Sequence, residues 1–532
     1  MKKDFIGTSG LIRLILRRDR ILLLIWILVT LGIILGSASS IDSVYPTVEA
    51  RYERFDQVMN IPMLVLFQSR AFDATLGALA TQQTFAGATI LAALGSALFL
   101  VRNTRKEEQT GRRELIGSTV VGRHAPLTAA LAVVLGSGMI LTLITALGLI
   151  GFGFSMAGSL ALGLVVGSAV GISASMAAVA AQLTENASVA SISAFGPFYC
   201  LHFVRGISNM GGESLAWLGW LVPNGWLENV RPFASERWWI FGLVAIWVFV
   251  LLKLAFKLSA IRDLGAGMIP VGNGPAIAPS GLRSPMGLAW RLQRRMLFFW
   301  IGLVTFISLP TGLVGPKGLQ EYAQGEWIQE YAATLNVASP ADAFFTYLLF
   351  VMVFPIAMYA IMATLRMRSD EVDGSAEMIL TTAVNRWQWA ASHLTFGLVA
   401  PVILLIIMGL SFGIGSGIQS GDLSGDLTRM LTLTTSLIPA VWVIVGITMA
   451  AIGLFGRGST VVGWTSLAVG IVTEIVVKMG LLPEWLFLTL SPFPHVNPYY
   501  QPTATTLLVL TFLSAILIST GFYGLRRRDL TN

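Results

Sequence analysis

The sequence has few charged residues and a single cysteine. Only 12% of its 532 residues are charged, whereas soluble proteins carry about 25%. Because 55% of the residues are hydrophobic, this scarcity excludes a water-soluble fold, in which most of them would have to be hidden from solvent. Cys200 stands alone; it therefore excludes an internal disulfide and is typical of a small packed apolar residue.

Motifs for enzymatic chemistry are absent as well. No stretch matches the phosphate-binding pattern Gly-x-x-x-x-Gly-Lys-Ser/Thr, and no polar region is long enough to form an ATPase domain. The four histidines show no metal-ligand spacing: they are His124, His202, His393 and His495. We therefore expect neither an enzyme nor a metal or cofactor held by this chain.

Long apolar runs are abundant. A helix that crosses the hydrocarbon core of a membrane needs about 20 apolar residues. The first half offers six such runs, at 21–40, 84–101, 127–150, 157–181, 187–204 and 238–256, and the second half six more, at 296–314, 344–365, 391–414, 431–455, 461–480 and 504–525. The sequence predicts an all-α polytopic membrane protein with about twelve transmembrane helices in two six-helix repeats, residues 1–264 and 285–532.

The basic residues set the orientation. Positive charges beside membrane spans stay in the cytoplasm, and 26 of the 35 Lys and Arg fall on one side if the N-terminus lies inside. We expect both termini to be cytoplasmic and the protein to lie in the cell membrane of a bacterium, in contact with lipid. The net charge of +7 follows from this topology and requires no nucleic-acid partner. Lys2 and Lys3 resemble the start of a signal peptide, but we expect a retained helix.

Glycine and proline mark two further features. Residues 265–284 begin with a stretch rich in both, which predicts a flexible cytoplasmic linker between the halves. Within the fourth apolar run, Gly163, Gly167, Gly171 and Ser175 recur every four residues. This spacing predicts a smooth helix face for close packing.

One loop occurs twice, at a constant offset of 263 residues. Arg105, Glu108, Gly111, Glu114 and Arg123 recur as Arg368, Glu371, Gly374, Glu377 and Arg386. Glu107 corresponds to Asp370 in the same way, whereas Ser375 and Ala376 stand in place of Arg112 and Arg113. Farther along, Arg262-Asp263-Leu264 parallels Arg528-Asp529-Leu530, and Pro223 parallels Pro492. The two halves therefore arose by duplication.

The repeated acidic residues allow two interpretations. They form a short amphipathic element that docks in a basic groove of a partner, or they are solvated charges that only fix the topology. We favour docking, because topology alone predicts no shared acidic positions. The expected contact residues are Glu107, Glu108, Gly111, Glu114, Asp370, Glu371, Gly374 and Glu377.

The loop Glu-Glu-x-x-Gly-Arg-x-Glu-Leu resembles that of type-2 permeases of ABC transporters, in the duplicated form described as exporters of polyketide antibiotics. The resemblance covers nearly the whole chain. It implies that residues 105–116 and 368–379 are coupling elements that dock on two copies of a separate ATP-binding subunit, which holds ATP and magnesium. It also implies that the chain moves hydrophobic, antibiotic-like or drug-like compounds outward by alternating access.

This resemblance further implies a substrate path along the second and fifth spans of each half. Aromatic residues suited to hydrophobic cargo occur there: Phe195, Phe198, Tyr199, Phe203, Phe350, Phe354, Tyr359 and Trp464. Ordinary packing between helices explains the same residues equally well. Glu474 is an acidic residue inside a predicted span and either binds cationic cargo or pairs with Lys478, four residues on.

Two other functions compete with an ATP-driven exporter. A proton-coupled secondary multidrug transporter also has six plus six helices, although the long outer segments after the first span of each half do not suit it. A membrane-embedded enzyme lacks any catalytic cluster.

Overall fold

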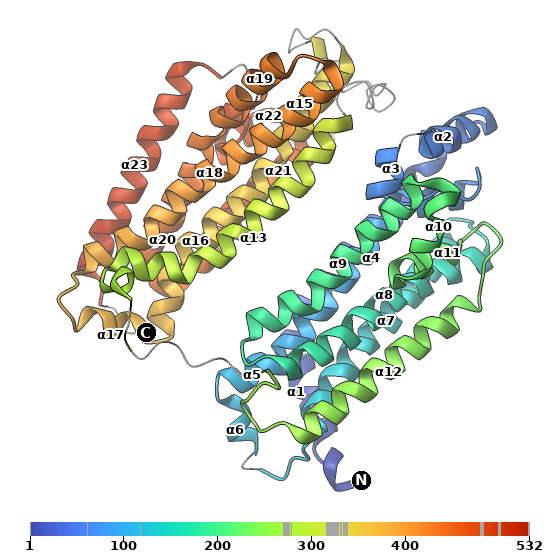
Figure 1. The fold of residues 1–532 in the computed structure, drawn as a ribbon, viewed down its shortest axis with the longest axis horizontal. Coiled ribbons are helices and arrows are strands. Elements are labelled where there is room, and N and C mark those ends of the chain that lie inside the picture. Colours follow the sequence, from blue (N-terminus) through green and yellow to red (C-terminus); the bar gives the residue numbers. More distant parts are fainter. Residues whose placement is uncertain are drawn as a thin grey trace. The chain divides into compact units, whose positions relative to one another are not determined.

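The computed structural model describes residues 2–60, 62–117, 119–269, 277, 279–314, 329, 332–333, 339–478, 483–497 and 502–529. The chain divides into two compact units, Met1–Gly274 and Pro275–Asn532. In Figure 1 the first unit runs from blue to green and the second from lime to red. All regular elements of the described ranges are helices.

Unit 1 is built around helix α8, which packs against α4, α7, α9, α11 and α12. Its elements in chain order are η1 (Lys2–Phe5), α1 (Thr8–Val44), α2 (Val48–Asn60), α3 (Pro62–Phe67), α4 (Leu76–Arg102), α5 (Arg105–Gln109), α6 (Arg112–Gly117), α7 (Ala125–Gly151), α8 (Met156–Leu183), α9 (Ala187–Met210), α10 (Gly212–Trp220), α11 (Pro223–Asn229) and α12 (Ile240–Ile261).

Small residues allow α8 to take this central place. A Cβ added at Gly163 would lie 2.5 Å from the carbonyl oxygen of Thr142 in α7. At Gly167 it would collide with the Thr142 hydroxyl, which donates to the Gly163 carbonyl at 3.0 Å. The predicted close packing is confirmed at Gly163 and Gly167, since a side chain at either glycine would push α7 away, whereas a Cβ at Gly171 would make only an ordinary contact of 3.5 Å with Val248 of α12.

Unit 2 contains η2 (Ser280–Arg283), α13 (Pro285–Val314), α15 (Pro340–Val351), α16 (Val353–Val372), α17 (Ser375–Leu380), α18 (Arg386–Ser420), α19 (Leu423–Ser436), α20 (Ile438–Phe455), η5 (Gly456–Gly458), α21 (Ser459–Lys478), α22 (Glu484–Leu490), η6 (Pro494–Val496) and α23 (Ala504–Arg527). Its packing repeats that of unit 1. In unit 1, α8 contacts α4, α9 and α12, and in unit 2 the equivalent helix α20 contacts α16, α21 and α23. Likewise, α1 contacts α7 in unit 1, and α13 contacts α18 in unit 2.

Among the described residues, eleven helical stretches are long and apolar enough to cross a membrane. One of them, Leu423–Glu474, is 52 residues long and contains both α20 and most of α21, which pack against each other. All twelve expected runs therefore overlap helices. The fold class predicted from the sequence, an all-α polytopic membrane protein, is confirmed.

The start of the segment expected to be a flexible linker is held in place. The amides of Met268 and Ile269 donate to the carbonyls of Gln182 and Leu183 at the end of α8, at 3.0 and 2.9 Å. Residues 265–269 thus form a fixed extension of unit 1. Residues 270–276 and 278 lie outside the described residues.

The segment between α11 and α12 covers one end of unit 1. Arg231, Phe233 and Ser235 adopt left-handed backbone angles, with φ of 57°, 62° and 60°. The Phe233 ring lies against the first turns of two helices, where a Cβ at Gly77 of α4 would be 2.5 Å from its Cγ and one at Gly158 of α8 would collide with it. These contacts hold the strained backbone, because strain persists only where the surrounding structure fixes it.

Candidate functional site

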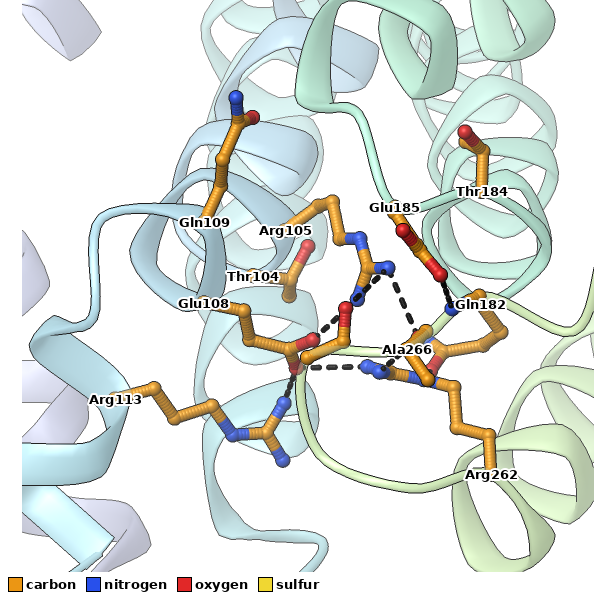
Figure 2. Close-up of polar contacts among 12 residues, drawn as sticks. Thr104, Arg105, Glu108, Gln109, Arg113, Gln182, Thr184, Glu185, Arg262 and Ala266 are labelled. Atoms are coloured by element: carbon orange, nitrogen blue, oxygen red, sulfur yellow. Dashed lines mark hydrogen bonds and ion pairs between the residues drawn. The ribbon is translucent and has the colours of Figure 1, made fainter. Parts of the chain in front are cut away.

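The first copy of the repeated loop contains a buried carboxylate surrounded by arginines. Glu108 lies in α5, directly after α4, and its side chain is only 1% exposed. Its Oε2 accepts a hydrogen bond from Arg105 at 2.6 Å and its Oε1 one from Arg262 at 2.7 Å. Arg113 of α6 contacts the same Oε1. Figure 2 shows the three guanidinium groups converging on this carboxylate. We call these four residues the Glu108 cluster.

The arginines of the Glu108 cluster also hold neighbouring segments. Arg105 donates to the carbonyls of Gly265 and Ala266 at 3.1 and 2.9 Å. Arg262, which follows α12, donates to the Gln182 side chain of α8 at 2.7 Å and to the Ala266 carbonyl at 2.9 Å. The cluster therefore joins the repeated loop to α8, to the end of α12 and to residues 265–269 (Figure 2).

The opposite charges of the carboxylate and the arginines strengthen the hydrogen bonds of the Glu108 cluster. Burial lowers the pKa of Arg113 to about 10, and the positive charges of Arg262, Arg105 and Arg123 act in the same direction. The guanidinium group still carries its charge at neutral pH. A buried carboxylate among charged arginines forms short charge-assisted hydrogen bonds, and loss of either partner leaves an uncompensated buried charge.

Unit 2 repeats the geometry as the Glu371 cluster, formed by Glu371, Arg368 and Arg528. Oε2 of Glu371 accepts from Arg368 at 2.7 Å and Oε1 accepts from Arg528 at 2.6 Å. Arg528 follows α23 as Arg262 follows α12. Ala376 replaces Arg113, so this cluster has two arginines instead of three.

In each unit, one arginine outside the cluster donates hydrogen bonds to carbonyls at the end of the last helix. Arg123 donates to the carbonyls of Ser259 and Arg262 at 3.1 and 2.8 Å. Its counterpart Arg386 donates to the carbonyls of Leu525 and Arg528 at 3.3 and 2.8 Å. Arg123 and Arg386, which are related by the offset of 263, therefore make equivalent hydrogen bonds in the two units.

The repeated glycines permit the sharp turn after each acidic helix. Gly111 and Gly374 have φ of 72° and 74°, a left-handed conformation that glycine adopts at little cost. Their amides donate to the carbonyls of Glu108 and Glu371 at 3.0 and 3.2 Å. The chain can then start α6 and α17 in a new direction.

The structure separates the acidic residues that the sequence grouped together. Glu108 and Glu371 are buried within their own units, so they do not lie on the docking surface expected for them. Glu107 is partly buried and contacts Arg18 at 2.8 Å, and Asp370 is buried and contacts Arg366 at 3.1 Å. The exposed acidic residues of the loops are Glu114, Asp373 and Glu377.

Sequence reasoning did not assign a role to Arg262, Arg528 or Arg113. The signal was present, because Arg262-Asp263-Leu264 recurs as Arg528-Asp529-Leu530 after the last helix of each half. The role of this repeated segment became clear only from the hydrogen bond between Arg262 and Glu108, which lie 154 positions apart. Pattern alone does not reveal such a contact.

The aromatic residues expected along a substrate path lie in packed surroundings. Five are buried within their own units: Phe198, Phe203, Phe350, Phe354 and Tyr359. Three are partly buried: Phe195, Tyr199 and Trp464. Phe195 stacks on Tyr199 at 5.8 Å, and Phe354 meets Phe493 edge to face at 4.9 Å. Lining of a path by these residues stays a prediction.

Glu474 is 3% exposed near the end of α21. The Lys478 side chain lies outside the described residues, so the expected pair stays a prediction. Unit 1 also buries a charge in its corresponding span: Arg205 of α9 is fully buried and forms an ion pair with Glu228 at 2.5 Å.

Apolar helices in two equivalent units, each tied to a short helical loop, define a duplicated multi-pass membrane protein. The chain is 34% identical to the multidrug efflux system permease protein Rv1217c of Mycobacterium tuberculosis (strain ATCC 25618 / H37Rv), over 99% of this chain and 95% of the relative. Residues 282–526 match the family model for the C-terminal domain of the multidrug efflux system permease Rv1217c. The chain belongs to this permease family, and the predicted multi-pass location in the cell membrane is confirmed.

Proposed function

We propose that this protein is the membrane-spanning permease of an ATP-driven exporter that expels hydrophobic drug-like compounds. The 34% identity to a multidrug efflux permease over nearly the whole chain supports drug export. Two copies of a separate ATP-binding subunit would supply the energy and would hold ATP and magnesium. Each copy would dock on one of the repeated loops, residues 105–116 and 368–379.

The observation that carries this proposal is the pair of buried glutamate clusters. Glu108 ties its loop to Arg262 at the end of α12, and Glu371 ties its loop to Arg528 at the end of α23. A partner that moves either loop would therefore also move the last helix of that unit. A loop that only fixed the topology would need no such connection.

The exposed face of each loop has the chemistry of a docking surface. Leu115 beside Glu114 is 74% exposed, and Met378 beside Glu377 is 68% exposed. An acidic group next to an apolar side chain suits a partner groove that is basic at its rim and apolar at its base. Arg112 is exposed in the first loop, while Ser375 takes its place in the second. The two loops would consequently bind with unequal strength.

A charge-reversal experiment tests the docking. The double variant Glu114→Lys, Glu377→Lys is co-expressed with a candidate ATP-binding subunit that co-purifies with the wild type. Co-purification and drug-stimulated ATP hydrolysis should both fall strongly, because the reversed charges face a basic rim. Glu213→Lys, which reverses the charge of an exposed glutamate in α10, serves as the control and should have no effect. Wild-type hydrolysis and co-purification in the double variant would exclude docking through these loops.

A proton-coupled carrier is the second candidate function, and one buried group favours it. In unit 2 the Asp370 carboxylate lies 3.3 Å from His393 Nε2, and Gln293 lies 3.4 Å from the other ring nitrogen. Such an acid–imidazole pair can hold and release a proton. Export from energised vesicles distinguishes the two functions. ATP depletion should stop an ATP-driven exporter, whereas a protonophore should stop a proton-coupled one.

A further inference from the structure

Beside the Glu108 cluster lies a cavity of about 410 Å³. It opens between α6, the first turn of α7 and the end of α12. Arg113, Arg123 and Arg262 line it together with one carboxylate, that of Asp263. The volume falls within the range of roughly 300–1,000 Å³ that is typical of ligand sites.

Two of the three arginines keep donors for a ligand. A guanidinium group has five N–H donors. Within the described part of the chain, Arg113 uses one terminal nitrogen for Glu108. Arg123 uses Nε and Nη2 for backbone carbonyls, and its Nη1 stays available. Arg262 is largely occupied by Glu108, Gln182 and Ala266.

Positive charge exceeds negative charge around this cavity. Three arginines line it, against Asp263 on the wall and Glu108 behind Arg113 and Arg262. Part of the lowering of the Arg113 pKa comes from repulsion by Arg262, Arg105 and Arg123. A bound anion would relieve this repulsion.

We propose that the cavity is a binding site for a phosphate-bearing anion, with Arg113 and Arg123 as its ligands. Arginine is the side chain best suited to phosphate, because its planar fork donates two parallel hydrogen bonds. The phosphate belongs either to the headgroup of an anionic lipid, which basic pockets between membrane helices are known to bind, or to a free phosphate compound. The site does not depend on the proposed ATP-binding partner.

Unit 2 shows what the scaffold looks like without the third arginine. Arg386 and Arg528 repeat the contacts of Arg123 and Arg262, but Ala376 is buried in the position of Arg113. The anion site is therefore a property of unit 1 alone. The same comparison indicates that Arg113→Ala is tolerated, because Glu108 would keep two arginines as Glu371 does.

The experiment compares the full-length wild type with Arg113→Ala and Arg112→Ala in lipid nanodiscs. Arg112 is the matched control, since its side chain is 63% exposed and its loss removes the same charge from the same helix. Inorganic phosphate is titrated at constant ionic strength in phosphatidylcholine discs, and retention of phosphatidylglycerol is measured by native mass spectrometry. Arg113→Gln, which keeps more of the side chain's packing, is the second variant.

Arg113→Ala should weaken binding of the phosphate group by about tenfold, the effect of losing one charge-assisted hydrogen bond, while Arg112→Ala should leave it unchanged. An effect on inorganic phosphate identifies a free anion as the ligand, and an effect on phosphatidylglycerol alone identifies a lipid. The proposal fails if the wild type binds neither probe, or if Arg112→Ala matches Arg113→Ala. It also fails if neither Arg113 variant folds, because Arg113 would then be only a structural partner of Glu108.

Discussion

Replacing Glu108 by glutamine should destabilise unit 1 more than loss of any exposed acidic residue. The carboxylate is 1% exposed, and the side chains of Arg105 and Arg262 are 0% and 5% exposed. Glutamine has nearly the same shape but no charge. The substitution therefore removes the negative charge and leaves the buried arginines without compensation.

The expected cost follows from this burial. Breaking a buried ion pair by removing one partner costs about 3–5 kcal/mol, most of it the penalty of the charge left behind. For a unit of this size, that corresponds to a fall in the unfolding temperature of roughly 6–20 °C. Glu114→Gln removes an exposed carboxylate from the same loop and should change stability by about 0.5 kcal/mol or less.

Thermal unfolding in detergent measures both variants, and a double-mutant cycle isolates the interaction. The cycle combines Glu108→Gln with Arg262→Gln. The double variant should be more stable than the sum of the single effects predicts, by about 1–3 kcal/mol, because the second change removes one of the uncompensated charges. If Glu108→Gln unfolds at the same temperature as Glu114→Gln, or if the two changes are additive, the cluster does not hold the loop to α12.

Two further predictions concern unit 1 packing and topology. Phe233→Ala should cost about 3–5 kcal/mol of stability, because the ring fills the space between two helix starts, while Phe249→Ala at a 66% exposed position should cost little in the same unfolding assay. In a Cys200→Ser background, a cysteine at exposed Val372 should be shielded from an impermeant thiol reagent in intact cells and one at exposed Glu49 should react. Labelling at 372 from outside would reverse the predicted topology.

Several properties could be read from the sequence because they depend on composition and local pattern. Apolar runs of about 20 residues have the length and composition of helices that cross a membrane, so the helical class and the position of each expected span were predictable. The duplication was visible because Glu108 and Glu371 keep a constant offset. The glycine spacing of Gly163 and Gly167 predicted a close helix contact, since residues four apart share one helix face.

The interpretation of the duplicated acidic residues was wrong in one respect. An acidic residue in a polar loop was expected to face a partner, yet Glu108 and Glu371 face arginines of their own units. Likewise, residues 265–269 contain the glycines of a flexible tether but hydrogen-bond to the end of α8. The first outcome requires α12 to end beside Glu108, and the second requires α8 to end beside residues 265–269. The residues close to Glu108 in the sequence do not determine where these helices end.

The sequence by itself determined that this protein is a duplicated helical membrane protein with one loop presented twice, because hydrophobicity and repetition act through residues close together in the chain. Only the tertiary structure decided which charges of that loop are internal and which are exposed. Arg262 reaches Glu108 across 154 positions, and it does so because α12 ends at the level where α5 begins. A buried charge takes the partner that packing brings to it, wherever that partner lies in the sequence.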